Sequence, residues 1–165
     1  MKRILNTVLM VLTVAAVSAQ QSLDFAEKFI TLCKSDSTVK CITISPKMME
    51  QLVKQHLEEK PENIVQAIEK LKSARIVSAR AALFEKADSL LKKHKRRFTA
   101  VKEYGGTDSK IHGAFYSRKN KKGQTVELVM LREDAENNSL TIVNLTGDID
   151  EEFLCFLYNN KTFKN

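Results

Sequence analysis

The segment from Gln124 to Gly147 most constrains the fold, because it contains two β-rich runs separated by a polar break. In an extended strand, alternate side chains of the first run point to opposite faces: Val126, Leu128 and Met130 to one, Val129 and Leu131 to the other. A strand that is apolar on both faces is typical of the covered interior of a sheet. The second run is Ser139–Thr146, and the turn-forming residues of Asp134–Asn138 predict a hairpin between the two runs.

The N-terminus has the pattern of a secretory signal peptide. Lys2 and Arg3 precede a mainly apolar run from Ile4 to Val17, and Val17-Ser18-Ala19 predicts cleavage before Gln20. The alternative, an uncleaved membrane anchor, requires about 20 apolar residues, and this run is shorter. No cysteine follows the cut, so a lipid anchor is not indicated. We therefore expect an exported protein, periplasmic or associated with the cell surface, with no transmembrane segment after cleavage.

The predicted mature chain has the length of one domain. Removal of residues 1–19 would leave 146 of the 165 residues, and we predict that residues 20–165 form a single α+β domain. Because Lys2 and Arg3 leave with the signal, the net charge falls from +7 to +5. Export argues against nucleic acid as a partner. The expected partners are a protein or an anionic glycan or lipid surface, unless the charge serves only solubility.

Two groups of basic residues are the candidate anion-binding site. The first group closes a predicted helix and the second occupies a predicted hairpin tip: Lys92, Lys93, Lys95, Arg96 and Arg97, then Lys119, Lys121 and Lys122. Basic residues at a helix C-terminus also stabilise the helix through its dipole. If the fold joins the groups, they form one basic surface for polyanions. We expect them to be separated, since helix ends and hairpin tips are scattered around a sheet.

Helix and strand signals alternate along the rest of the chain. Helices are predicted for 22–33, from Pro46, from Pro61 and for 83–94, and strands for 39–45, 98–104 and 111–118. Pro61–His94 could form one helix, but Arg75–Ala79 is poor in helix formers and we predict a strand there. Asp148 has capping-box spacing to Glu151 before a final helix. The fold class is therefore α+β: a mixed, largely antiparallel sheet of about five to six strands with packed helices, its C-terminal β-meander followed by a short helix.

Cys33, Cys41 and Cys155 do not form a disulfide scaffold, because their number is odd and small. A bridge between Cys33 and Cys41 is one alternative. The other, which we favour, is that all three are small buried apolar residues.

The sequence has no nucleotide-binding loop, nucleophile elbow, zinc-ligand pair or redox Cys-x-x-Cys motif. His56, His94 and His112 are far apart in sequence, and the Asp-x-Asp at Asp148–Asp150 lacks the glycine of a calcium loop. We thus predict no catalytic, cofactor-binding or metal residues, and favour a non-enzymatic envelope protein. The alternative is a hydrolase-like periplasmic enzyme with a scattered site, which a cleft holding two or more strongly perturbed pKa values would favour.

Several quoted runs together resemble a known family. They are the signal peptide, Ile44–Met49, Glu127–Leu131 and Leu140–Ile149. This combination resembles the exported bacterial proteins of the domain of unknown function numbered 4252, over nearly all of the mature chain. The resemblance implies a periplasmic or cell-surface protein and transfers no active site. Some members are lipidated, and the missing cysteine at the cleavage site departs from those.

Overall fold

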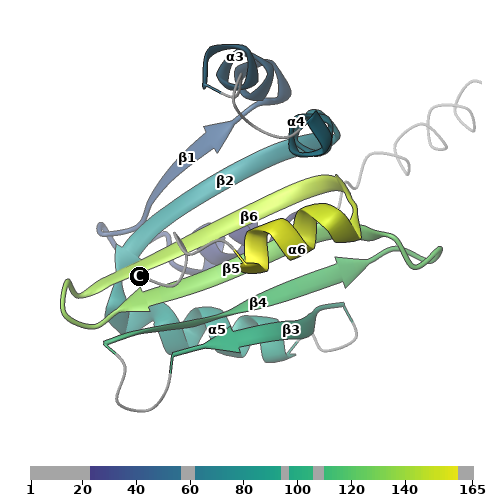
Figure 1. Cartoon of the computed structure of the whole chain (residues 1–165). Coiled ribbons are helices and arrows are strands. Elements are labelled where there is room, and N and C mark those ends of the chain that lie inside the picture. The colour runs from purple at the N-terminus through teal and green to yellow at the C-terminus, as the bar shows by residue number, and fades with distance from the viewer. Residues whose placement is uncertain (1–22, 57–61, 94–96, 106–109, 160–165) are drawn as a thin grey trace, which may run out of the picture.

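A six-stranded antiparallel sheet forms the centre of the computed structural model, which describes residues 23–56, 62–93, 97–105 and 110–159 (Figure 1). The strands lie in the order β1-β2-β6-β5-β4-β3. Their bounds are β1 Lys40–Ile44, β2 Leu71–Arg80, β3 Thr99–Tyr104, β4 Ile111–Lys119, β5 Thr125–Asp134 and β6 Ser139–Ile149. The last three form a β-meander that leads into a short helix, so the predicted α+β class is confirmed.

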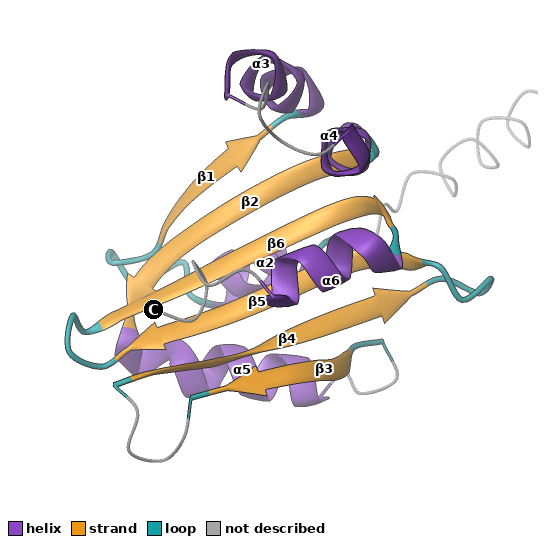
Figure 2. Ribbon diagram, in the orientation of Figure 1, coloured by secondary structure: helices purple, strands orange, loops and turns teal. Residues whose placement is uncertain are grey.

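Helices cover both faces of this sheet (Figure 2). On one face lie α2 (Phe25–Leu32) and α5 (Phe84–Lys93), the latter preceded by a 3₁₀ turn, Ala81–Leu83. On the other lie α4 (Glu62–Glu69) and α6 (Glu151–Asn159), and α3 (Pro46–His56) packs beside α4. Each face therefore encloses its own apolar core.

Strand β5 is the interior strand predicted from its two apolar faces. Val129 and Leu131 pack in the core beneath α2 and α5, whereas Leu128 and Met130 pack in the opposite core. All four are at most 5% exposed. The prediction that Val126 shares the face of Leu128 is wrong, because a register shift between β5 and β6 at the start of β5 breaks the alternation there, and Val126 lines a hollow beside α2.

The local signals around the first two strands are confirmed. The Ser45 hydroxyl accepts a hydrogen bond from the Met48 N–H and Pro46 is the first residue of α3, where a missing N–H has no cost. Within the ambiguous segment, the described residues 62–93 form a helix, a strand and a second helix, as predicted. Its strand β2 is longer than predicted because it pairs with both β1 and β6.

Two predicted details are wrong. Helix α6 is capped by Asp150, whose carboxylate accepts from the Phe153 N–H at 2.9 Å, and not by Asp148. The reason is that β6 continues to Ile149, which pairs with Thr125. Of the cysteines only Cys33 is buried, while Cys41 and Cys155 are exposed, and all three are free.

Within the described residues, no helix is both long enough and apolar enough to span a bilayer. The predicted signal peptide lies outside the described residues, so cleavage after Ala19 stays a prediction.

Candidate functional site

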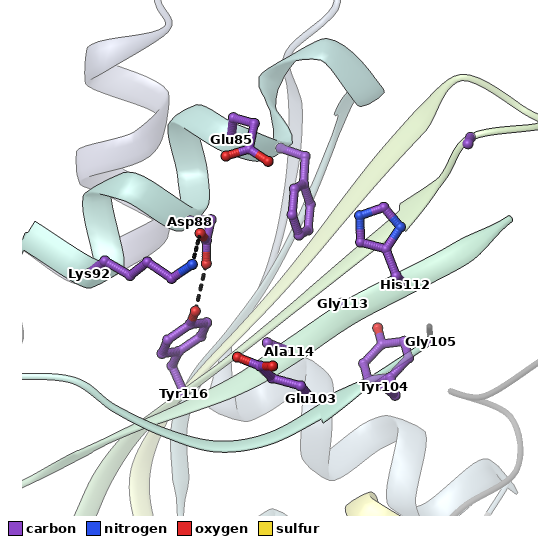
Figure 3. A pocket seen from close by; sticks show the side chains of 12 residues that line it. Glu85, Asp88, Lys92, Glu103, Tyr104, Gly105, His112, Gly113, Ala114 and Tyr116 are labelled. Carbon is purple, nitrogen blue, oxygen red and sulfur yellow. Dashed lines mark hydrogen bonds and ion pairs between the residues drawn. The ribbon is translucent and has the colours of Figure 1, made fainter. Parts of the chain in front are cut away.

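A pocket of about 590 Å³ lies between α5 and strands β3 and β4 (Figure 3). We call it the α5–β4 pocket. The ionisable side chains that line it include Glu85, Asp88, Lys92, Glu103, His112 and Tyr116. Ligand sites in proteins usually occupy about 300–1,000 Å³. The volume is thus sufficient for a small organic group or a side chain of a partner.

Asp88 is the central polar group of this pocket. Its carboxylate accepts a hydrogen bond of 2.6 Å from the Tyr116 hydroxyl and forms an ion pair with Lys92, one turn later on α5 (Figure 3). Only 7% of Asp88 is exposed, and Tyr116 is 3% exposed. A carboxylate this buried requires partners, and the hydrogen bond from Tyr116 of β4 to Asp88 of α5 links the helix to the sheet.

The other wall of the pocket depends on a close approach between β3 and β4. A Cβ at Gly113 would collide with the Leu131 carbonyl and the Tyr104 ring, so only glycine allows this approach. The Tyr104 hydroxyl donates to the Leu131 carbonyl oxygen at 2.8 Å. His112 packs edge-to-face on Phe84, with ring centroids 4.9 Å apart, and its Nε2 lies 2.7 Å from the Glu133 carboxylate. Aromatic rings therefore line a pocket that carboxylates also face.

Carboxylates outnumber amines in the pocket. The pKa of Lys92 is raised, first by its hydrogen bond to Asp88 and further by the charges of Glu103 and Glu85. Both glutamates are exposed and make no ion pair within the described part of the chain. Three carboxylates thus surround one ammonium, and a second cation entering the pocket would meet a favourable potential.

Several groups that line the pocket have perturbed pKa values, the feature expected of an enzyme, and each of these pKa values is raised. Burial raises the pKa of Tyr104 to about 12, and burial together with Asp88 raises the pKa of Tyr116 still further from its ordinary value. Lys92 is likewise held in its charged form. A general acid or base works best with a pKa near the working pH. These groups keep their protons at neutral pH and are suited to binding.

The raised tyrosine pKa values predict an abrupt alkaline transition. The three tyrosines of the chain are Tyr104, Tyr116 and Tyr158, and burial raises each pKa, to about 12 for Tyr104 and Tyr158. The unfolded chain releases these protons near pH 10, so stability is complete below about pH 10 and declines as pH rises toward about 12.

An absorbance titration of tyrosinate, followed in parallel with circular dichroism, measures this transition. We expect ionisation to coincide with unfolding, and the chain in urea to titrate near pH 10. The chain has no tryptophan, so the tyrosinate signal is clean. Reversible ionisation near pH 10 with an unchanged folded spectrum would contradict the burial of these side chains.

A second hollow, of about 690 Å³, lies at the start of α2, and four of its five charged residues form ion pairs. Arg75 lies 3.3 Å from Asp24 and 3.4 Å from Glu27, and Arg118 lies 2.7 Å from Glu127. Glu127, only 1% exposed, also accepts from the Phe25 N–H at 2.7 Å. These groups hold α2 on the sheet, so the role we assign to this hollow is structural.

Glu127 is a residue whose importance the sequence analysis missed. It lies in an apolar run whose pattern predicts only a strand. Asn144, on the neighbouring strand, donates to the Glu127 carboxylate at 3.1 Å and accepts from the Ala26 N–H at 2.9 Å. A carboxylate and an amide within two apolar strands were the available signal of a buried polar network.

The predicted basic groups lie closer together than expected. Thr99 of β3 pairs with Ser117 of β4, so Arg97 and Lys119, each two residues beyond this pair, emerge at the same end of the sheet (Figure 1). The expected separation of the two basic groups is wrong, because β3 begins shortly after α5 and pairs antiparallel with β4. Lys95 and Arg96 lie outside the described residues. Lys92 faces the α5–β4 pocket instead.

We call the remaining five residues the basic end: Lys93, Arg97, Lys119, Lys121 and Lys122. All five are exposed, and none of them forms an ion pair with another described residue. Among the ranges that the structure describes, no three His, Cys, Asp or Glu side chains are placed to hold a metal ion.

The fold and the pocket define a class of small α+β proteins with one antiparallel sheet, helices on both faces and an open pocket under one helix. A family model described as "Domain of unknown function (DUF4252)" matches residues 34–154. The chain therefore belongs to this family. Neither a curated protein nor a solved structure matches this chain.

Proposed function

We propose that the chain is an exported, non-enzymatic envelope protein that binds a cationic group of a partner in the α5–β4 pocket. The cation is a protonated amine or guanidinium, carried by a partner protein or by a small molecule. The observation that carries this proposal is the excess of carboxylates, Glu85, Asp88 and Glu103, around the single ammonium of Lys92. Export is supported by the N-terminal residues, which have the pattern of a cleaved signal.

The walls of the pocket favour a cation attached to an apolar body. The Phe84 and Tyr116 rings and the Ala114 and Ala135 methyl groups line it beside the carboxylates. An ammonium beside an aromatic ring gains a further attraction of roughly 0.5–1 kcal/mol at an exposed site. The ligand is therefore expected to combine one positive charge with an aliphatic or aromatic group.

The alternative, a hydrolase-like enzyme, fits the same pocket less well. A covalent hydrolytic mechanism requires a nucleophile activated by a nearby base, and Asp88, the carboxylate that the Tyr116 hydroxyl contacts, is already paired with Lys92. A raised pKa makes each tyrosine a poorer nucleophile at neutral pH. These contacts support binding over catalysis.

Calorimetric titration with benzylammonium tests the proposal. Benzyl alcohol is the matched neutral ligand, and we expect it to bind about tenfold more weakly, because ion pairs with at least two carboxylates, of up to about 1 kcal/mol each, are lost. The double variant Glu85→Gln, Glu103→Gln should weaken benzylammonium binding about tenfold for the same reason.

The control variant removes two exposed carboxylates elsewhere, Glu69→Gln with Glu151→Gln, and should bind as the unmodified chain does. A short peptide with one lysine distinguishes the two sources of the cation, since a partner protein would present a side chain. Equal binding of the charged and neutral ligands would refute the proposal. Turnover of ester or amide substrates that Tyr116→Phe abolishes would favour the enzyme instead.

A further inference from the structure

The basic end is a second charged surface, distinct from the α5–β4 pocket. Its five cations come from three segments: the last turn of α5, the segment just before β3, and the end of β4 with the turn that follows it. The register of β3 on β4 brings the three segments to one end of the sheet (Figure 1). The exposure of all five side chains leaves their charges available to a partner.

The turn that follows Lys119 and carries Lys121 and Lys122 is fixed by its own hydrogen bonds. The Asn120 side chain accepts from the Lys122 N–H at 2.8 Å and from the Gln124 N–H at 3.1 Å. The Gly123 N–H donates to the Asn120 carbonyl at 3.0 Å, and Gly123 has φ +83°, which favours glycine. The turn therefore holds Lys121 and Lys122 beyond the last paired residues of β4 and β5, where Lys119 pairs with Thr125.

Two acidic residues at the same end of the sheet, Asp150 and Glu152, lie on its opposite face. Helix α6 covers the face opposite α5 (Figure 2). At the start of α6 the carboxylate of its capping residue Asp150 lies 3.3 Å from Lys70, and Glu152 in the first turn accepts from the Asn63 amide. These carboxylates are engaged with residues of the opposite face, so they do not neutralise the basic end.

We propose that the basic end attaches the protein to an anionic lipid surface. Its cations lie on a projecting turn and a helix end, and none of the five lines the α5–β4 pocket or the hollow at α2. Such a convex array contacts a flat field of headgroups better than it encloses a polymer chain. Clusters of four to eight Lys and Arg residues are typical of binding to anionic lipids.

Co-sedimentation with vesicles tests this proposal. The chain beginning at Gln20 is used, because all described elements lie beyond that residue and the apolar run before it would itself enter vesicles. Vesicles of phosphatidylglycerol with phosphatidylcholine should bind the protein, and vesicles of phosphatidylcholine alone should not. Binding should fall between about 0.01 and 0.15 M salt, as the Debye length shrinks from about 30 to about 8 Å.

The deciding variant is Lys119→Gln, Lys121→Gln, Lys122→Gln, for which we expect a loss on the order of 100-fold, since each lysine contributes about fivefold. The matched control, Lys34→Gln, Lys40→Gln, Lys47→Gln, removes the same charge elsewhere and should retain most binding. Circular dichroism verifies that both variants fold. Equal losses in the two variants, no binding to anionic vesicles, or binding to soluble heparin but not to vesicles would each overturn the proposal.

Discussion

Leu128→Asp should leave the chain unfolded under conditions in which the unmodified protein is folded. Leu128 is 2% exposed in the centre of β5, between Ser117 of β4 and Leu145 of β6. Burial of such a side chain contributes roughly 1.5–3 kcal/mol, and an unpaired aspartate in its place adds a penalty of several kcal/mol. The sum approaches the whole stability of a small domain, which is about 5–15 kcal/mol.

Circular dichroism and urea unfolding measure the effect. The control is Lys121→Glu, a charge reversal at an exposed turn, which should change the free energy of unfolding by less than about 0.5 kcal/mol. If the two variants were equally stable, β5 would not be the covered interior strand on which the fold depends.

Glu127→Ala should have the second largest effect, about 3–5 kcal/mol of lost stability. The carboxylate binds the Arg118 guanidinium, the Phe25 N–H and the Asn144 amide, at 2.7, 2.7 and 3.1 Å. Its removal leaves the Phe25 N–H without its acceptor at a nearly dry position, and the Arg118 guanidinium and the Asn144 amide each lose a hydrogen bond. Glu127 binds the Phe25 N–H of α2 directly, and it also binds Asn144, which accepts from the Ala26 N–H. We therefore expect α2 to loosen before the rest of the fold.

Hydrogen exchange of the α2 amides, together with urea unfolding, distinguishes this local effect from general destabilisation. Glu127→Gln keeps the shape and one acceptor, so it should lose less stability than Glu127→Ala. Glu69→Ala, at an exposed site, is the control and should leave both measurements unchanged. Full protection of α2 in Glu127→Ala would show that the buried network does not anchor this helix.

The sequence was sufficient to predict the strands whose pattern is local. The two apolar faces of β5 and the turn before β6 are encoded within a few residues, and so is the strand Arg75–Ala79 inside a segment without glycine or proline. The cap of α6 was misplaced because the end of β6 depends on its pairing with Thr125. The exposure of Cys41 likewise depends on the position of β1 at the sheet edge.

The candidate site was not predictable from residue spacing. Asp88 and Tyr116 are 28 residues apart and meet only because α5 packs on the face to which Tyr116 of β4 points. Nothing in the sequence near Glu103 or His112 indicates a pocket, since each is an ordinary strand residue by pattern. The strand order that joins the two basic groups was equally hidden, because propensity predicts a strand but not its neighbour.

The most direct test of the binding proposal is to locate the ligand. Amide resonances of the protein, recorded by NMR during titration with benzylammonium, report which residues it contacts. We predict saturable shifts at Asp88, Gly113, Ala114 and Ala135, which line the α5–β4 pocket, and their loss in the variant Glu85→Gln, Glu103→Gln. Shifts confined to another part of the molecule, or equal shifts with benzyl alcohol, would contradict the proposal that this pocket binds a cation.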